Sequence, residues 1–309
     1  MTMTAVSRRP LEHVVSSEQF GRELLDSLFA RAADLQDVRD ARLQGRIMAT
    51  LFYEPSTRTR LSFESAMLRL GGSVLGTEAA HTFSSAIKGE TLEDTIRMVS
   101  TYADVIVLRH DQLGAAVRAA QAATVPVINA GDGPGEHPTQ ALLDLFTIQR
   151  ELGRIDGVRV ALCGDLRFGR TARSLAVLLS LYPDVRLTFV APEVVQVGDD
   201  ILRRLEERGV HYSLAAQLDD VIGDVDVVYQ TRVQKERFTD PHEFEQARSA
   251  IRIDAGVMRR LNPGAIVMHP LPRVDEIATE VDSDPRAAYF RQAANGVAIR
   301  MALLEMLLA

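Results

Sequence analysis

Three hydroxyl side chains and two arginines form the stretch Ser56-Thr57-Arg58-Thr59-Arg60. An apolar run over residues 47–53 precedes it and predicts a buried strand, and apolar residues at three- and four-residue spacings after it predict a helix over 57–70. The start of a helix has unpaired N–H groups and the positive end of a dipole, so it attracts anions. The stretch indicates a phosphate or carboxylate site, although helix capping beside exposed arginines gives the same pattern. We expect the hydroxyls to serve both roles.

Other polar side chains also follow predicted strands. In open parallel sheets, ligands bind beyond the carboxyl ends of the strands. The strands are expected at 47–53, 105–108, 125–129, 158–163, 185–190, 225–229 and 265–268. The residues after them include Ser56, Thr57, Arg58 and Thr59, then Arg109, His137, Gln140, Arg170, Arg232 and Gln234, and finally Pro270, Leu271 and Pro272. Any one of the four arginines could be a solvated surface residue, but together they suit substrates with several negative charges.

The remaining polar residues limit the possible chemistry. His137 could cap or pack against the next helix, or it could donate a hydrogen bond to a carbonyl oxygen that becomes negative in a transition state. No pair of carboxylates is placed as acid and base, and the seven histidines show no metal-ligand spacing. The turn from Gly164 to Gly169 lacks the second close glycine of a dinucleotide fingerprint, which argues against NAD binding. Cys163 lies in an apolar strand and is expected to be a buried bystander.

Length, charge and element order define the class of protein. The chain has 309 residues, enough for about two domains, and strands alternate with helices throughout. We expect an α/β fold of two doubly wound parallel-sheet domains with the active site in the cleft between them. The first domain would span 1–152 and the second 153–291. The segment 292–309 contains the last helix, which begins at about Asn295 and would pack back on the first domain. The net charge of −7 argues against nucleic-acid or anionic-membrane partners. No apolar run has the length of a membrane span or signal peptide, so we expect a cytoplasmic protein.

Three motifs, in this order, resemble those of the carbamoyltransferase family over nearly the whole chain. They are Ser56-Thr-Arg-Thr-Arg60, His137-Pro-Thr-Gln140 and His269-Pro-Leu-Pro272. Three features are similar to the aspartate branch rather than the ornithine branch. They are the loop Ser84-Ser-Ala-Ile-Lys88, the segment Thr231-Arg-Val-Gln-Lys-Glu-Arg237, and a late motif without the cysteine of the ornithine branch.

This resemblance implies a reaction: transfer of the carbamoyl group of carbamoyl phosphate to L-aspartate, in de novo pyrimidine biosynthesis, with neither cofactor nor metal. It also implies a role for each residue. Ser56, Thr57, Arg58 and Thr59 would bind the phosphate, Arg109 would bridge the phosphate and the carbonyl oxygen, and His137 with Thr59 would polarise that oxygen. Gln140 and the backbone carbonyls near Pro270 and Leu271 would bind the carbamoyl amino group, with a cis bond between Leu271 and Pro272. Arg170, Arg232 and Gln234 would bind the two carboxylates of aspartate.

The family resemblance further implies a homotrimer with shared active sites, in which Ser84 and the catalytic Lys88 come from a neighbouring subunit. Glu54 would pair with Arg170 and Arg237 when the site closes. Regulatory chains, or a neighbouring pathway enzyme such as a dihydroorotase, remain possible partners. A related transcarbamylase with another acceptor, such as ornithine, and a non-catalytic binding protein of the same fold remain the alternatives.

Overall fold

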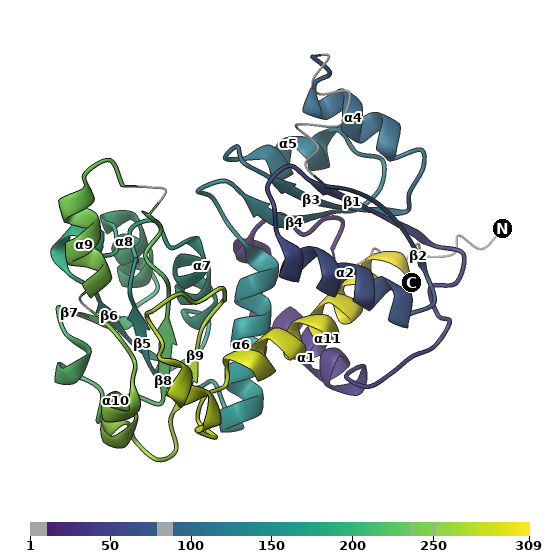
Figure 1. Ribbon diagram of the computed structural model, residues 1–309. Coiled ribbons are helices and arrows are strands. Elements are labelled where there is room, and N and C mark those ends of the chain that lie inside the picture. The colour runs from purple at the N-terminus through teal and green to yellow at the C-terminus, as the bar shows by residue number, and fades with distance from the viewer. Residues whose placement is uncertain (1–10, 79–88, 236–237, 250) are drawn as a thin grey trace. The chain divides into compact units, whose positions relative to one another are not determined.

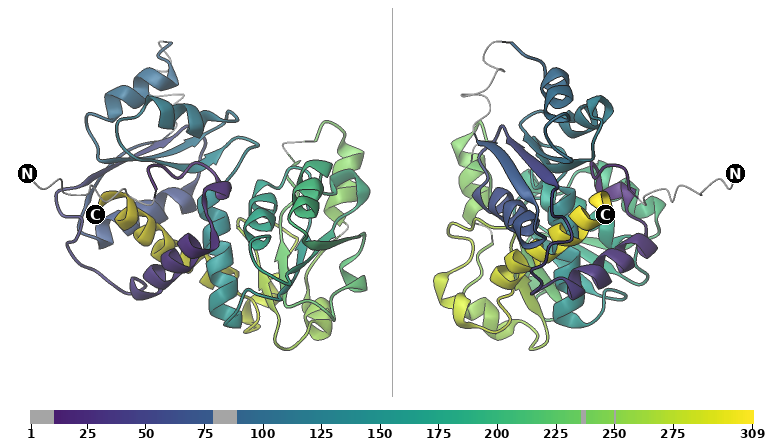
Figure 2. Two further views of the ribbon diagram at one scale, coloured as in Figure 1. Left: turned by 180° about the vertical axis from the view of Figure 1, so that it is seen from behind. Right: turned by 90° about the vertical axis from the view of Figure 1, so that its right-hand side faces the viewer.

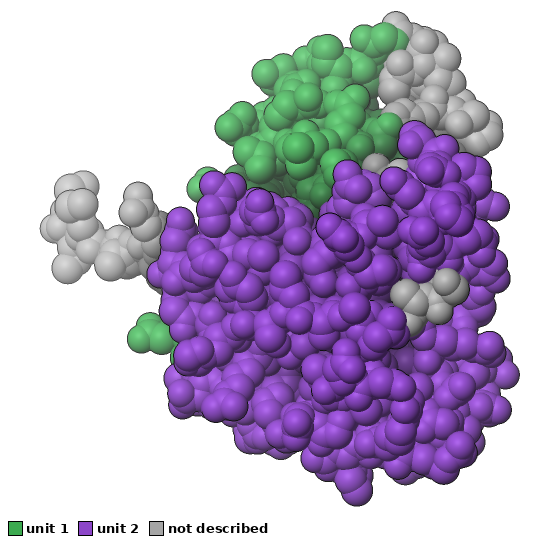
Figure 3. All heavy atoms as spheres, turned by 90° about the vertical axis from the view of Figure 1, so that its left-hand side faces the viewer, with its two compact units in different colours: residues 1–139, 297–309 green, residues 140–296 purple. Residues whose placement is uncertain are grey.

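The computed structural model describes residues 11–78, 89–235, 238–249 and 251–309 (Figure 1). The chain forms two compact units, residues 1–139 with 297–309 (unit 1) and residues 140–296 (unit 2), which Figure 3 shows in different colours. Each unit has its own parallel sheet, which confirms the predicted fold class. The boundaries between the two units lie inside helices, after residues 139 and 296, whereas the predicted domain boundaries were after 152 and 291. The limits of the two substrate-binding domains stay a prediction.

Unit 1 contains a four-stranded parallel sheet in the order β2-β1-β3-β4. Its strands are β1 Ile47–Phe52, β2 Ser73–Glu78, β3 Val105–His110 and β4 Val127–Asp132, and its helices are α1 Arg22–Asp34, α2 Thr57–Arg69, α4 Leu92–Val99 and α5 Ala115–Ala122. Helices α4 and α5 cover one face of the sheet and α2 covers the other (Figures 1 and 2). The central strand β3 is apolar along most of its length because both of its faces are buried.

The segment before α1 extends this sheet, which the sequence pattern did not predict. Val14 forms a parallel bridge with Ile128, and its N–H donates to the carbonyl of Val127 at 2.8 Å. Ser16 caps a short 3-10 helix, η1 Ser17–Gln19, and not α1, which begins at Arg22 after Gly21. The residues before α1 are therefore joined to the edge strand β4.

Unit 2 contains a five-stranded parallel sheet in the order β7-β6-β5-β8-β9. Its strands are β5 Arg159–Cys163, β6 Arg186–Val190, β7 His211–Ala215, β8 Val227–Gln230 and β9 Ile266–Met268. Its helices are α7 Arg170–Leu179, α8 Asp199–Glu207, α9 Pro241–Ser249 and α10 Ala255–Arg260, with the short 3-10 helices η3 Glu193–Val195, η4 Leu218–Asp220 and η6 Thr279–Ser283. Two helices pass from one unit to the other, α6 Pro138–Leu152 and α11 Tyr289–Leu308.

Three elements of unit 2 were not predicted, and a fourth begins earlier than expected. Strand β7 lies at the sheet edge with a largely exposed surface, so it lacks the apolar run of a buried strand. Helices α9 and α10 have few apolar residues at helical spacing. Helix α11 begins at Tyr289, six residues before the expected Asn295. Each miss occurs where the local sequence carries little hydrophobic pattern.

The strand order reverses at one point in each sheet. In unit 1 the chain leaves β1 toward β2 on one side and returns to β3 on the other, and in unit 2 the same change occurs between β5 and β8. A crevice forms beyond the carboxyl ends of such strands, which is the usual place for a ligand. The four arginines selected from the sequence lie near these strand ends: Arg58 and Arg170 in the first turns of the helices after β1 and β5, Arg109 near the end of β3, and Arg232 in the loop after β8.

Candidate active site

The turn between β1 and α2 leaves the N-terminus of α2 open. Ser56 occupies the N-cap position with φ −160° and ψ 84°, and no side chain of the described residues caps the helix. Ser56 uses its backbone carbonyl, which accepts the N–H of Arg60 at 3.1 Å. The prediction that its hydroxyl also caps the helix is therefore wrong. The described first turn contains no acidic residue, so the positive end of the helix dipole is not offset there.

Helix α4 shows what a closed N-terminus looks like in the same unit. The hydroxyl of Thr91 accepts the N–H of Asp94 at 3.2 Å, and Glu93 and Asp94 add negative charge to the first turn. In α2 those positions hold Arg58 and Thr59, and partial burial lowers the pKa of the Arg58 guanidinium from its ordinary value. Thr59 is 7% exposed beside it. The start of α2 is thus built to receive an anion.

Arg109 lies next to this turn because β1 and β3 are paired. Arg109 on β3 lies opposite Phe52 on β1. The backbone carbonyl of Arg109 accepts the N–H of Tyr53 at 2.8 Å. The guanidinium donates to the carbonyl of Ala130 at 3.1 Å and pairs with Glu54 at 3.2 Å. The predicted partners of Glu54 were Arg170, which belongs to unit 2, and Arg237, which lies outside the described residues. In the structure, Glu54 helps to hold Arg109 beside the start of α2.

Two carboxylates shape the loop that ends at His137. Asp132 accepts the N–H groups of Glu136 at 2.8 Å and Gly114 at 3.0 Å. Glu136 accepts the hydroxyl of Ser16 and the N–H of Ser17, both at 2.7 Å. The loop is therefore joined to the segment before α1. His137 follows at the start of α6 and is 5% exposed.

In unit 2, the loops after β5 and β8 are cross-linked by Asp165, which is fully buried. Its carboxylate accepts the N–H of Phe168 at 2.9 Å and the N–H of Gln234 at 3.3 Å. The side-chain amide of Gln234 donates back to the carbonyl of Phe168 at 2.9 Å. Arg170 begins α7 directly after this turn. The structure thus joins the loop that carries Arg170 to the loop that carries Arg232 and Gln234.

The glycines of the β5–α7 turn allow close backbone approach. Gly164 has φ +103°, and a Cβ there would lie 2.3 Å from the carbonyl oxygen of Thr231. A Cβ on Gly169 would lie 2.1 Å from the carbonyl oxygen of Asp165. These contacts explain the two glycines without a bound dinucleotide. Cys163 is buried, as predicted, and burial raises the pKa of its thiol, which disfavours the reactive thiolate.

The segment after β9 is held by a buried histidine. The Nδ1 atom of His269 accepts the N–H of Leu271 at 2.8 Å, so Nε2 carries the proton and donates to Glu276 at 2.7 Å. Burial alone would raise the pKa of Glu276, but hydrogen bonds from His269 and backbone N–H groups lower it below its ordinary value. The peptide bond between Leu271 and Pro272 is cis, as predicted. His269 therefore fixes the backbone whose carbonyls were predicted to bind substrate.

The predicted residues fall into two sets. Unit 1 carries Ser56, Thr57, Arg58, Thr59, Arg109 and His137; unit 2 carries Gln140, Arg170, Arg232, Gln234, Pro270, Leu271 and Pro272. Ser84 and Lys88 lie outside the described residues. The positioning carboxylates Asp132, Glu136, Asp165 and Glu276 were not predicted. The only available sequence signal was an acidic residue near a turn that contains glycine or proline. This signal does not show which residue the carboxylate binds.

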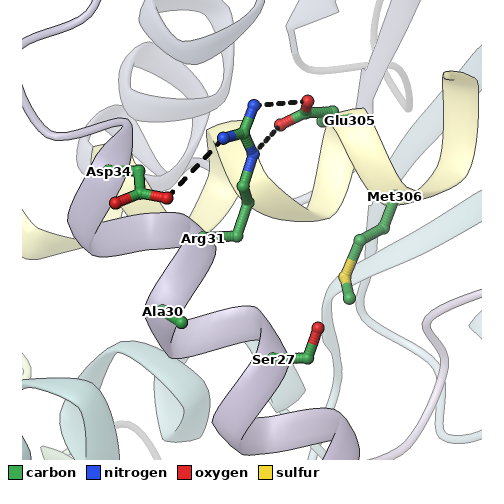
Figure 4. Close-up of a pocket in the computed structure, with 6 residues that line it drawn as sticks. All are labelled: Ser27, Ala30, Arg31, Asp34, Glu305 and Met306. Carbon is green, nitrogen blue, oxygen red and sulfur yellow. Dashed lines mark hydrogen bonds and ion pairs between the residues drawn. The ribbon is translucent and has the colours of Figure 1, made fainter.

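A pocket elsewhere in unit 1 has a different character. It measures about 380 Å³ and lies between α1 and α11, lined by Ser27, Ala30, Arg31, Asp34, Glu305 and Met306 (Figure 4). Arg31 is bound to Glu305 by two hydrogen bonds of 2.7 Å. Its charge is thus already compensated, and the pocket contains none of the predicted site residues. Within the described part of the chain, no cluster of metal-binding side chains occurs and no helix is long and apolar enough to cross a membrane.

Comparison with known proteins finds two matching domains, and the boundary between them places Gln140 with the residues of unit 1 rather than with those of unit 2. Residues 12–150 match the carbamoyl-phosphate-binding domain of the aspartate/ornithine carbamoyltransferases, and residues 156–307 match their aspartate/ornithine-binding domain. The chain belongs to this family.

Its relatives within the family are aspartate carbamoyltransferases. The chloroplastic aspartate carbamoyltransferase 1 of Pisum sativum is 57% identical over 96% of this chain and 79% of that protein. The catalytic subunit from Methanocaldococcus jannaschii is 46% identical over 96% of this chain and 98% of that protein. Aspartate transcarbamoylase from Trypanosoma cruzi, crystallised with carbamoyl phosphate and aspartate, has a TM-score of 0.92 and 46% identity, covering 96% of this chain and 97% of that one.

Proposed function

We propose that the chain transfers the carbamoyl group of carbamoyl phosphate to the amino group of L-aspartate, which gives N-carbamoyl-L-aspartate and phosphate. The observation that carries this proposal is the open N-terminus of α2. Its backbone N–H groups, the hydroxyls of Ser56, Thr57 and Thr59, and the guanidinium of Arg58 form a site for a phosphate group. The crystal structure of the Trypanosoma cruzi relative with carbamoyl phosphate and aspartate supports the same assignment.

In this mechanism the residues of unit 1 stabilise charge. The aspartate amine forms a bond to the carbamoyl carbon, a tetrahedral oxyanion develops, and the bond to the phosphate oxygen breaks while the amine proton leaves with the phosphate. His137, Thr59 and Arg109 donate hydrogen bonds to the oxyanion, and Arg109 also neutralises the phosphate. Preorganised donors of this kind act most strongly when they are held in place before the reaction. Glu54 and Ala130 hold Arg109 in this way.

The residues of unit 2 select and orient the substrates. Arg170, Arg232 and Gln234 bind the two carboxylates of aspartate, since forked guanidinium donors match carboxylates. Gln140 and the carbonyls of Pro270 and Leu271 accept hydrogen bonds from the carbamoyl amino group. Holding both substrates in reactive geometry can supply about 7–11 kcal/mol. Neither cofactor nor metal takes part.

A direct assay separates this function from its alternatives. The purified chain is supplied with carbamoyl phosphate and either L-aspartate or L-ornithine, and the carbamoylated product is measured. We expect product with aspartate and none with ornithine, and the reverse result would assign the chain to the other branch. Binding of a bisubstrate phosphonate without turnover of either acceptor would favour a non-catalytic protein.

The active unit is proposed to be a homotrimer with shared sites. Leu61 and Leu68 support this because they lie two turns apart on one face of α2 and are 55% and 61% exposed. Ser84 and Lys88 would complete the site of a neighbouring subunit. Light scattering should give the mass of a trimer. Mixing inactive Lys88→Ala and His137→Ala chains should restore activity, because hybrid trimers contain some sites with both native residues, and no recovery would contradict shared sites.

The place in pyrimidine biosynthesis, the cytoplasmic location, and association with regulatory chains or a dihydroorotase are further predictions. The plant relatives are named as chloroplastic proteins, so the location needs a direct test. Fractionation of the source cells, followed by size-exclusion chromatography of the native protein, would locate the enzyme and show whether other chains copurify with it.

A further inference from the structure

One buried carboxylate in unit 2 joins two parts of the proposed carbamoyl site. Asp144, on α6, is fully buried. Its Oδ1 atom accepts the side-chain amide of Gln140 at 2.8 Å and that of Gln292 at 2.6 Å, and its Oδ2 atom accepts the hydroxyl of Tyr229 at 2.6 Å. All four residues belong to unit 2. Burial raises the pKa of Tyr229 well above its ordinary value, and the negative charge of Asp144 adds to that effect, so the tyrosine keeps its proton and remains a donor.

The carboxylate determines which end of each amide faces outward. An ionised carboxylate can only accept hydrogen bonds, so both glutamines must turn their NH₂ groups toward Asp144 and their carbonyl oxygens away from it. The carbonyl oxygen of Gln292 then accepts the N–H of His269 at 2.8 Å. His269 in turn accepts the N–H of Leu271 at 2.8 Å. Asp144 therefore fixes the orientation of the Gln292 amide, and two further hydrogen bonds, through His269 and Leu271, connect this amide to the cis-proline segment.

The carbamoyl amino group needs hydrogen-bond acceptors around it. It has two N–H donors, and the groups assigned to it are the side-chain oxygen of Gln140 and the backbone carbonyls of Pro270 and Leu271. An amide that faced the wrong way would present an NH₂ group to another NH₂ group and lose the hydrogen bond. Both sets of acceptors depend on Asp144, one directly and the other through Gln292 and His269.

We propose that Asp144 is a positioning residue that gives the site its specificity for a carbamoyl group over an acyl group without an amino group. This inference rests on the proposed function, because it deepens the recognition of carbamoyl phosphate. The carboxylate holds Gln140 with its oxygen outward and, through Gln292 and His269, holds the carbonyls of residues 270 and 271. The phosphate half of the substrate belongs to the residues of unit 1 and does not depend on this network.

The test compares two ligands that differ only at this position. Acetyl phosphate has a methyl group where carbamoyl phosphate has its amino group. Both glutamine amides donate to the Oδ1 atom of Asp144, so Asp144→Ala removes the acceptor that holds them and leaves either amide free to reverse. We expect the affinity for carbamoyl phosphate, measured by calorimetry, to fall by about 10- to 100-fold. The affinities for acetyl phosphate and inorganic phosphate should stay close to those of the native chain.

Tyr229→Phe is the matched control. It removes the third hydrogen bond to Asp144 and leaves both amides oriented, so the preference for carbamoyl over acetyl phosphate should stay. A double-mutant cycle of Asp144→Ala with Gln140→Met tests the pathway, because the second change should add little once the amide is no longer held in orientation. If Asp144→Ala does not fold, Gln292→Met tests the arm that leads to His269 with the same three ligands.

Equal losses of affinity for carbamoyl and acetyl phosphate would overturn the proposal, since they would show a merely structural role. An unchanged preference in both Asp144→Ala and Gln292→Met would overturn it as well. Failure of the proposed function would look different: the native chain would form no N-carbamoyl-aspartate. The binding comparison does not use aspartate, so the two failures can be told apart.

Discussion

The β1–α2 turn of unit 1 and the β5–α7 turn of unit 2 occupy the same place in their sheets and are built differently. Each follows a strand at the point where the strand order reverses, and each leads into a helix with no acidic residue in its described first turn and no side-chain cap from the described residues. The β5–α7 turn encloses its own carboxylate, Asp165, which accepts two backbone N–H groups. In the β1–α2 turn, Glu54 points to Arg109 and leaves the helix end open.

This difference matches the ligand proposed for each turn. A phosphate has acceptor oxygens on all sides, so a helix end with its N–H groups and hydroxyls can bind it directly. The two carboxylates of aspartate lie at a set separation, so they need side chains at set positions. In unit 2 two of the loop N–H groups are already bound to Asp165, and the residues proposed to recognise aspartate are the side chains of Arg170, Arg232 and Gln234. The β1–α2 turn would bind its ligand directly, whereas the β5–α7 turn would support side chains that bind the ligand. Mutations in the two turns should therefore have different effects on ligand binding.

The largest effect is expected at His137, which acts directly on the reacting group. His137→Ala removes one donor to the oxyanion, and the loss of such a donor costs about 2.7–4 kcal/mol, or 10²–10³ in kcat. Steady-state kinetics with saturating substrates measures the loss, and circular dichroism checks the fold. Native turnover in this variant would remove His137 from the mechanism.

A smaller effect is expected at Arg58. Arg58→Gln removes a charged donor to the phosphate, and hydrogen bonds to charged groups contribute about 1.5–3 kcal/mol, so affinity should fall roughly 10- to 100-fold. Calorimetry with inorganic phosphate measures this loss, and thermal unfolding should be nearly unchanged because the partly covered side chain is still largely exposed. Arg69→Gln, at the opposite end of the same helix, is the control and should bind phosphate normally. Equal losses in both variants would argue against a site at the start of α2.

Asp165→Asn should weaken the binding of aspartate and leave the binding of phosphate unchanged, which would distinguish the roles of the two turns. The asparagine cannot accept both backbone N–H groups, and leaving one unpaired costs about 1–3 kcal/mol of the free energy of unfolding. We expect a roughly tenfold rise in the KM for aspartate, because Arg170 and Gln234 lose their fixed positions. The affinity for inorganic phosphate should not change. A parallel loss of phosphate affinity would contradict the separate support of the two turns.

The smallest effect concerns the acid stability that Glu276 contributes in unit 2. Its folded-state pKa is lowered from an ordinary value of 4.5, so the folded state binds its proton less readily than the unfolded state. Its contribution is fully present above pH 4.5 and is lost as the pH falls through the folded-state pKa. In urea unfolding, the stability difference between the native chain and Glu276→Gln should therefore shrink between pH 6 and pH 3. A constant difference would show that the ionised carboxylate contributes nothing.

The sequence predicted the parts of the fold that have a strong local pattern. Helix α2 runs from Thr57 to Arg69, close to the expected 57–70, and the buried strands lie within a few residues of their predicted positions. Strand β7 was missed because an exposed edge strand has no apolar run. The hydroxyl pattern at Ser56 was compatible with a cap, and only the backbone angles show that the carbonyl is used instead.

The supporting residues of the site could not be predicted from local patterns. Asp144 and Gln292 are 148 positions apart in the chain, and Asp165 and Gln234 are 69 apart. A buried carboxylate and an exposed one look the same in sequence until the fold brings their partners together. The residues proposed to face the ligand were selected because they follow strands, whereas the residues that hold them have no fixed relation to a strand end.

Helix α11 determines the order in which the two units can finish folding during translation. Its last turns complete unit 1, where Glu305 binds both Arg31 and Arg42, but residues 140–296 are translated before residues 297–309. At about 5–20 residues per second, a ribosome needs roughly 8–30 s to cross that interval. Unit 1 must wait for its last segment during this time, while most of unit 2 has already emerged. The nascent chain therefore completes its second half before its first.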